Sequence, residues 1–219
     1  MHRAFPPTPF HSPEPSRFFR PHRRVFAFNL DGTLTSREIL PEIAACAGLE
    51  KKLTDLTHRT LKGEIDFELS FRKRFAMLRH IPLSVVQDVV ASIPLDPHIA
   101  SFIKKRNDEC VIVTGNLDLW IRPILSRLGC RYFASQGKIV DGKLEIESVL
   151  DKGNTANQMK IQRKYIVAVG ESINDLPLFQ NSDVSIAFSG VHAAIPEIVA
   201  CAQYHARDGA DLCRLLQSL

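Results

Sequence analysis

The sequence lacks any long apolar run, since no segment approaches the roughly 18 consecutive apolar residues that a membrane-spanning helix needs. We therefore expect no transmembrane helix and no membrane partner. No apolar stretch of the signal-peptide type follows the basic N-terminal residues, so a secretory signal is not expected either.

Cysteine is scarce. The five cysteines are odd in number, lie scattered along the chain and never occur at CxxC spacing. This pattern argues against a disulfide framework and against a zinc site. It favours a reducing compartment, and we expect the protein to be cytoplasmic.

Positive charge is in excess only in the N-terminal segment of the chain. Residues 1–24 contain five arginines and one glutamate, whereas the other residues hold 23 basic and 23 acidic side chains. Six of the 13 prolines also lie in this segment, which disfavours a helix there. We predict a disordered, basic, proline-rich arm over residues 1–23, and contact with an anionic partner stays open as its role. Because the rest of the chain is neutral, nucleic-acid binding is not favoured.

What is present is the composition of a globular domain, with 45% apolar and 24% charged residues in a chain of 219. Such a chain can bury a full core, as one domain or as one domain with an insertion. Residues 24–30 predict a buried strand that ends at a turn-forming Asp-Gly. From 37 to 92, apolar residues recur at three- and four-residue spacing without a strand signal, which predicts helices.

Strand and helix patterns alternate after residue 95. The expected elements are strands at 109–114, 131–134, 165–169 and 183–188, a helix at 117–128 and a small hairpin at 139–146. This alternation predicts a parallel sheet with helices on both faces. The predicted fold class is therefore α/β: a Rossmann-like three-layer parallel sheet formed by 24–36 and 95–219, with a helical cap at 37–94 inserted after the first strand.

Three polar segments follow predicted strands, namely Asn29–Thr33, Thr114–Asn116 and Gly170–Asp175. Ligands of parallel sheets bind beyond the carboxyl ends of the strands, so these segments are expected to form one site. The first combines a carboxylate, a glycine and a hydroxyl, which suits a metal and a phosphate. Glycine allows the backbone N–H groups to approach a phosphate closely.

Four motifs occur in a fixed order: NLDGT at 29–33, VTGN at 113–116, DKG at 151–153 and VGESINDLPLF at 169–179. Together they resemble the haloacid dehalogenase superfamily of phosphotransferases. Two segments of the insertion, EILPEIAACAG at 38–48 and LKGEIDFELSFRKRF at 61–75, are similar to phosphoserine phosphatases. The resemblance covers about residues 24–215. It implies the core fold of that superfamily, phosphatase activity and a place in serine biosynthesis.

The resemblance also implies an aspartyl-phosphate type of site that holds Mg²⁺. In the family, the first Asp of DxDGT attacks phosphorus, and Asn29 stands at this nucleophile position. The second Asp, Asp31, protonates the leaving alcohol and then activates water. Thr114 would bond a phosphoryl oxygen, and Lys152 would offset its charge. The implied metal-site residues are Asn29, Asp31, Glu171 and Asp175.

The insertion implies the substrate. By resemblance, Glu38 meets the ammonium group of the substrate and Arg74 its carboxylate, for which a guanidinium is well shaped. The other substrate-binding residues implied are Leu61, Phe67, Gly115 and Asn174. The expected partner is a small phosphorylated metabolite such as phosphoserine, bound by a monomer or a homodimer.

Ordinary structural explanations compete with these roles. Asp31-Gly32 is also a common turn, Thr114 could satisfy its hydroxyl at a strand end, and Lys152 could be solvated. Asp175, beside Leu176-Pro177, could cap a helix. The order of the four motifs favours the functional interpretation.

Two residues depart from the family pattern. Asn29 replaces the nucleophilic Asp, and an amide cannot form a stable acyl-phosphate. Glu171 replaces the Asp of a GDxxND motif, and its extra methylene adds about 1.5 Å of reach. A designed substitution, deamidation of Asn29 to Asp, and a natural paralogue stay open as explanations. The second change, Glu171, favours the natural paralogue.

Two hypotheses from different classes follow. The first is a Mg-dependent phosphomonoester hydrolase that resembles phosphoserine phosphatase and acts on a small phosphorylated amino acid or related metabolite. The second is a catalytically impaired paralogue that binds a phospho-metabolite in a regulatory or non-catalytic role.

Overall fold

The computed structural model describes residues 23–162 and 164–219, without the side chain of Leu61. The predicted arm therefore lies outside the described residues, apart from Arg23, which begins the first strand. None of the described helices combines the length and the apolar character that crossing a membrane requires.

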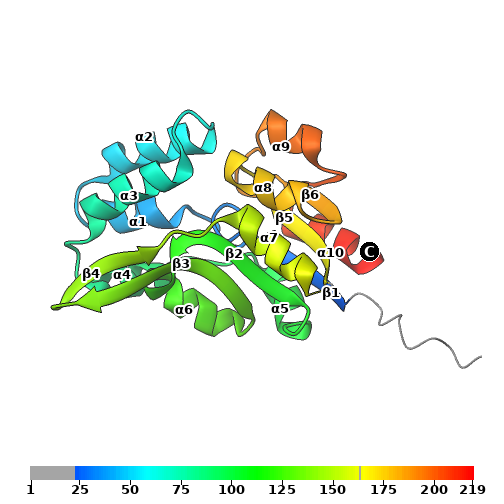
Figure 1. Ribbon diagram of the computed structural model, residues 1–219, viewed down its shortest axis with the longest axis horizontal. Helices are drawn as coiled ribbons and strands as arrows, with labels where there is room; N and C mark the ends of the chain where they lie inside the picture. The colour runs from blue at the N-terminus through cyan, green and yellow to red at the C-terminus, as the bar shows by residue number, and fades with distance from the viewer. Residues whose placement is uncertain (1–22, 163) are drawn as a thin grey trace, which may run out of the picture.

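The described chain forms one seven-stranded sheet with helices on both faces, which confirms the predicted α/β class (Figure 1). The strands are β1 Arg23–Phe28, β2 Cys110–Leu117, β3 Arg131–Val140, β4 Lys143–Ser148, β5 Lys164–Gly170, β6 Val184–Phe188 and β7 Tyr204–Ala206. Their order is β4-β3-β2-β1-β5-β6-β7. All neighbouring pairs are parallel except the β3–β4 hairpin.

Helices fill the connections between these strands. They are α1 Ile39–Ala45, α2 Glu50–Leu61, α3 Phe67–Leu78, α4 Leu83–Ser92, α5 Pro97–Lys105, α6 Asp118–Leu128, α7 Lys152–Ile161, α8 Leu176–Gln180, α9 Pro196–Cys201 and α10 Gly209–Ser218, with a 3₁₀ turn, η1, at Ile173–Asp175. The sequence predicted the element types well and some of the bounds less well. β2 continues three residues beyond the predicted end at Thr114, and β3 runs without a break into the hairpin.

The sheet separates two apolar clusters because side chains alternate along each strand. In β1, Phe26 and Phe28 face the larger cluster, which includes residues of α5, α6 and α10. Val25 and Ala27 face the other cluster, with residues of α7, α8 and α9. Burial on both faces explains why the strands were visible in the sequence as continuous apolar runs.

Helices α1–α4 form the insertion after β1, which is called the cap below. Its two ends meet at an isolated bridge between Thr35 and Leu95, where Asp96 N–H donates to the Leu34 carbonyl at 2.9 Å. The chain thus leaves and re-enters the core at one place, close to the predicted limits of 37 and 94. In Figure 1, α1, α2 and α3 gather at one end of the molecule, beyond the carboxyl ends of β1 and β2. The division into domains stays a prediction.

Trp120 of α6 connects the cap with the core. Its fully buried indole lies 5.7 Å from the Phe75 ring and 6.4 Å from the Phe71 ring, both on α3. Aromatic pairs at such distances add to the free energy gained from burying their surface. This contact fixes α3 above the core, and α3 also carries Phe67 and Arg74.

Replacing Trp120 by Ala should therefore destabilise the protein by about 3–5 kcal/mol, as expected when a large buried aromatic side chain is removed. The measurement is the free energy of unfolding in urea, followed by circular dichroism because the only tryptophan is lost. Val85→Ala on α4, at a side chain 40% exposed, is the control and should change stability by less than about 0.5 kcal/mol. Equal losses for the two variants would contradict the role of Trp120.

Candidate active site

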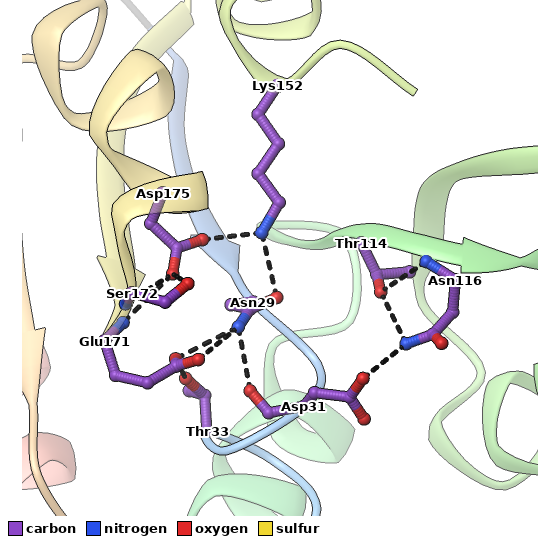
Figure 2. Close-up of polar contacts among 9 residues, drawn as sticks. All are labelled: Asn29, Asp31, Thr33, Thr114, Asn116, Lys152, Glu171, Ser172 and Asp175. Carbon is purple, nitrogen blue, oxygen red and sulfur yellow. Dashed lines mark hydrogen bonds and ion pairs between the residues drawn. The ribbon is translucent and has the colours of Figure 1, made fainter. Parts of the chain in front are cut away.

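The site lies where the carboxyl ends of β1, β2 and β5 meet, as the parallel order of these strands requires. Figure 2 shows that residues following these strands are linked by hydrogen bonds, with the main-chain carbonyl of Asp31 joining two groups of side chains. Asn29 joins the β1 segment to Glu171 after β5, and Asn116 of β2 donates to Asp31. Lys152, at the start of α7, donates to Asn29. All four predicted motifs thus contribute to one place.

The turn after β1 depends on Gly32, which has a φ of +66°. The Leu30 carbonyl accepts from the Leu34 and Thr35 N–H groups at 2.9 and 3.1 Å, and so closes the turn. A Cβ at Gly32 would lie 3.1 Å from Glu171 Oε1. Glycine is therefore required both by the backbone conformation and by the close approach of the Glu171 side chain.

Asn29 is the centre of the network, with only 5% of its surface exposed. Its Oδ1 accepts from Lys152 Nζ at 2.9 Å. Its Nδ2 donates to the Asp31 carbonyl at 2.8 Å and to both carboxylate oxygens of Glu171 at 3.0 Å. Every polar atom of the amide is thus paired within the protein (Figure 2).

Lys152 and Asp175 form a buried ion pair at 2.5 Å, with side chains 3% and 0% exposed. The other Asp175 oxygen, Oδ2, accepts from the N–H groups of Glu171 and Ser172 and from the Ser172 hydroxyl. Asp175 makes no side-chain cap to α8, the alternative that the sequence left open. Both of its oxygens instead hold the segment after β5 against Lys152.

Asp31 points away from this cluster, toward β2 and the cap. Its Oδ1 accepts from the Ile39 N–H at 3.1 Å and its Oδ2 from Asn116 Nδ2 at 2.8 Å. Burial, together with the nearby charge of Glu38, raises the pKa of Asp31 to about 7, against the hydrogen bond from Asn116. A carboxyl group with a pKa near neutrality can both give and take a proton, which a general acid–base requires.

Burial, together with the nearby charge of Asp175, also raises the pKa of Glu171 well above its usual value. The Asn29 amide opposes this rise. The Thr33 hydroxyl donates to Glu171 Oε2 at 2.7 Å, so the carboxyl group is held on the side of the β1 turn.

A pocket with a cavity of about 50 Å³ lies between this edge and the cap. Nine of the predicted site residues line it: Asn29, Asp31, Glu38, Phe67, Arg74, Thr114, Gly115, Glu171 and Asn174. A cavity of this size holds a few water molecules, so a larger ligand requires the cap to move. Phe67 closes the pocket against Gly115, where a Cβ would come within 2.0 Å of the ring.

Two cap residues bring opposite charges to the pocket. Arg74 is 5% exposed, and among the residues that the structure describes its guanidinium makes only long hydrogen bonds of 3.4 Å, to the Ser70 carbonyl and the Thr57 hydroxyl. It also lies over the Phe67 ring, 6.0 Å from the ring centroid. Within the described residues, no carboxylate lies at ion-pair distance from it. Glu38 Oε1 is buried and, within the same part of the chain, has no hydrogen-bond partner. Unpaired buried charges are costly, so Arg74 is suited to a ligand that pairs with it. Across residues 23–162 and 164–219, Glu38 is in ion-pair contact only with half-exposed His192, so it also has room for a ligand cation.

Most predicted site residues thus lie together, but some of them line the pocket and others lie behind it. Lys152 and Asp175 lie behind Asn29 and do not line the pocket. The side chain of Leu61 lies outside what the structure describes. Among the residues that had no individual role in the sequence prediction are Asn116 and Thr33, which belong to the predicted site segments, and His192, which belongs to none. The first two lie within the VTGN and NLDGT motifs, which could have indicated them, whereas nothing in the sequence around His192 does.

His192, in the segment after β6, reaches across to Glu38. Its Nε2 lies 3.4 Å from Glu38 Oε1, within ion-pair reach but without the geometry of a hydrogen bond. The contact with Glu38 raises the pKa of His192, and partial burial opposes this rise. The His192 side chain is half exposed.

The metal that the resemblance implies does not fit these residues as they are arranged. Mg²⁺ needs oxygen ligands in a tight octahedron. Here Asn29 directs its amide nitrogen toward Glu171 and the Asp31 carbonyl, where the resemblance implies the metal. Both carboxylate oxygens of Asp175 already accept hydrogen bonds from the chain. No group of three or more His, Cys, Asp or Glu side chains in the described part of the chain converges on a common point.

Comparison with known proteins identifies the family to which the chain belongs. The family model of the haloacid dehalogenase-like hydrolases matches residues 26–180, and the chain belongs to this family. The phosphoserine phosphatase of Methanocaldococcus jannaschii is 28% identical over 87% of this chain and 92% of its own length. That of Lactococcus lactis subsp. lactis is 27% identical over 83% and 88%. Among solved structures, a substrate-bound phosphoserine phosphatase complex superposes with a TM-score of 0.78 at 28% identity, covering 91% of this chain and 100% of the other.

The contact between His192 and Glu38 predicts a pH effect. Since the carboxylate stabilises the imidazolium, His192 should titrate above its ordinary pKa of 6.5, and Glu38→Gln should lower its pKa. The stabilisation is present below the unfolded pKa and is lost as the pH rises through the higher folded pKa. The measurement is an NMR titration of the histidine ring protons, with exposed His98 as the internal reference. An unchanged His192 titration in Glu38→Gln would contradict the contact.

Proposed function

We propose that the protein hydrolyses a small phosphomonoester that carries an ammonium and a carboxylate group, of which phosphoserine is the model. The observation that carries this proposal is the pair of opposite charges at the cap, Arg74 and Glu38, which face the same pocket as Asp31. In the part of the chain that the structure describes, Arg74 forms no ion pair and Glu38 is in ion-pair contact only with half-exposed His192. A guanidinium pairs with a carboxylate and a carboxylate with an ammonium group. An amino-acid phosphate offers both partners together with the phosphoryl group.

The phosphoryl group would bind toward the sheet. Thr114 and the glycine backbone at Gly115 line that side of the pocket. Lys152 lies directly behind Asn29 and supplies positive charge there. The relatives that are named phosphoserine phosphatases support phosphoserine as the model substrate by similarity.

The proposed step uses water as the nucleophile, because the Asn29 amide cannot form a stable acyl-phosphate. Water attacks phosphorus, the bond from phosphorus to the alcohol oxygen breaks, and the Asp31 carboxyl gives its proton to that oxygen. The Asp31 carboxylate then takes a proton from the attacking water, so the products are the alcohol and phosphate. Its pKa of about 7 suits both transfers. Magnesium, which the sequence led us to expect, has no part in this step.

Turnover by this route should be slow. Removing the nucleophile of a catalytic unit costs on the order of 10⁴–10⁶ in rate. Binding of the same metabolite without turnover is therefore the second candidate function, and one observation favours it: all polar atoms of Asn29 are already paired. The cytoplasmic location and the monomeric or dimeric state stay predictions.

Asp31→Asn separates the two candidates. If the protein is a hydrolase, phosphate release from phosphoserine should be measurable above the buffer rate and should fall to that rate in the variant, because no proton can be given to the leaving oxygen. For the unmodified chain, kcat/KM should decrease as the pH rises through about 7, where Asp31 loses its proton. Intact-mass measurement controls for deamidation of Asn29.

Ligand binding is measured on the same samples by calorimetry. Retained binding of phosphoserine with no phosphate release by the unmodified chain would reject the hydrolase and leave the binding protein. If the protein neither releases phosphate from phosphoserine nor binds phosphoserine, both candidate functions are rejected.

Arg74→Ala tests the substrate class. Loss of one charged hydrogen-bonded contact should raise KM for phosphoserine about 10- to 100-fold. Hydrolysis of an aryl phosphate, which has no carboxylate, should change little. Arg72→Ala is the matched control, because Arg72 lies two positions away on α3 and pairs with exposed Glu68 instead. Equal losses on both substrates would count against the proposed role of Arg74.

A further inference from the structure

We propose that Asn29 and Glu171 form a matched pair that takes the place of the divalent metal of the family, so that this chain holds its site together without Mg²⁺. The juxtaposition that carries the proposal is the Asn29 amide nitrogen between the Asp31 carbonyl and the Glu171 carboxylate. This inference concerns metal binding and stability, and does not depend on turnover.

The orientation of the amide follows from its neighbours. Lys152 Nζ can only donate, so the atom 2.9 Å from it must be the acceptor Oδ1. In the opposite orientation, Nδ2 would face this ammonium and Oδ1 would face the Glu171 carboxylate, so every contact would be repulsive. The Asn29 nitrogen therefore points to the side of Glu171, where the family resemblance places the metal.

The surroundings of this nitrogen are those of a cation. Three oxygen atoms lie within 3.0 Å of it: the carbonyl of Asp31 and the two carboxylate oxygens of Glu171. With Asp at position 29, two carboxylates would meet in a buried space, which requires a cation or a proton between them. The two hydrogens of the amide satisfy the same oxygens without any ion.

The length of Glu171 completes the pair. Its extended side chain lies against Gly32 and accepts from Thr33 Oγ1 at 2.7 Å. An Asp at this position would be shorter by about 1.5 Å. It would then withdraw from Asn29 and Thr33 and leave space between them. The two departures from the family pattern thus depend on each other.

The remaining acids do not offer a substitute site. Lys152 and three donors of the segment Glu171–Ser172 occupy the oxygens of Asp175. The Asp31 carboxylate is turned toward Ile39 and Asn116. A metal would therefore have to break several buried hydrogen bonds before it gained its ligands.

Titration with Mn²⁺, followed by electron paramagnetic resonance, tests the proposal, since Mn²⁺ and Mg²⁺ prefer the same oxygen ligands. The unmodified chain should show no saturable Mn²⁺ site into the millimolar range. The double variant Asn29→Asp with Glu171→Asp should bind one Mn²⁺, and Mg²⁺ should raise its melting temperature. The matched control combines Asn157→Asp and Glu147→Asp at exposed positions, and should gain no site.

One saturable Mn²⁺ site in the unmodified chain would overturn the proposal. So would a folded double variant that binds no metal, because the pair would then not be what excludes it. If the double variant does not fold, the Mn²⁺ titration of the unmodified chain tests the proposal by itself: a saturable site contradicts it and the lack of one supports it.

A thermodynamic cycle tests the pairing without any metal. Asn29→Asp should lower the melting temperature in the presence of a chelator, because its carboxylate faces that of Glu171. In the background of Glu171→Gln, where position 171 carries no charge, the same substitution should lower it less. An equal loss in both backgrounds would show that Asn29 and Glu171 are not coupled, and would overturn the proposal.

Discussion

The hydrogen bonds of the buried Lys152 ammonium group are the constraint on which the rest of the site depends. Lys152 begins α7, yet its Nζ reaches Asn29 after β1 and Asp175 after β5. Lys152 is only 4% exposed as a residue, so its ammonium group must be paired, since burying an isolated charge is very costly. Breaking a buried ion pair by removing one partner typically costs about 3–5 kcal/mol. The three segments are therefore held at fixed positions relative to one another before any ligand binds.

The hydrogen bonds of Lys152 also determine the direction in which the polar atoms of Asn29 and Asp175 point. Because Lys152 takes Oδ1 of Asn29, the amide nitrogen is directed to Glu171. Because Lys152 also pairs with Oδ1 of Asp175, the other carboxylate oxygen of Asp175 is free to accept hydrogen bonds from the backbone after β5. The acids of the site are thus divided between two tasks. Asp175 and Glu171 fix the segment after β5 and the turn after β1 through buried hydrogen bonds, and Asp31 is the acid proposed to transfer protons in the pocket.

The fold could be predicted from the sequence because its signals are local. Strands buried on both faces appear as apolar runs, and the cap appears as a change of period from strand to helix. Bounds were less accurate where the tertiary structure extends an element, as in β3, whose second half is ordered by pairing with β4. Spacing alone does not contain that information.

The site was predictable to the extent that its residues lie in the four motifs. The order of the motifs located Asn29, Asp31, Thr114 and Glu171 at one edge of the sheet, but not the direction in which their side chains point. That direction is set by partners far along the chain, as in the contact of Asn29 with Glu171, which are separated by 142 positions. His192 was missed for the same reason, because its relation to Glu38 exists only in three dimensions.

The cap and the core divide recognition from chemistry. Asp31 stands at the boundary, since its Oδ1 accepts from the first N–H of α1 and its Oδ2 from Asn116 of β2. Any movement of α1 that admits a ligand therefore changes the hydrogen bonding of the proposed general acid. The charges of Glu38 and Arg74 act on the pKa of Asp31 in opposite directions. A ligand that neutralises both would leave burial as the main cause of its high pKa, so the group would remain able to donate a proton once the pocket has closed.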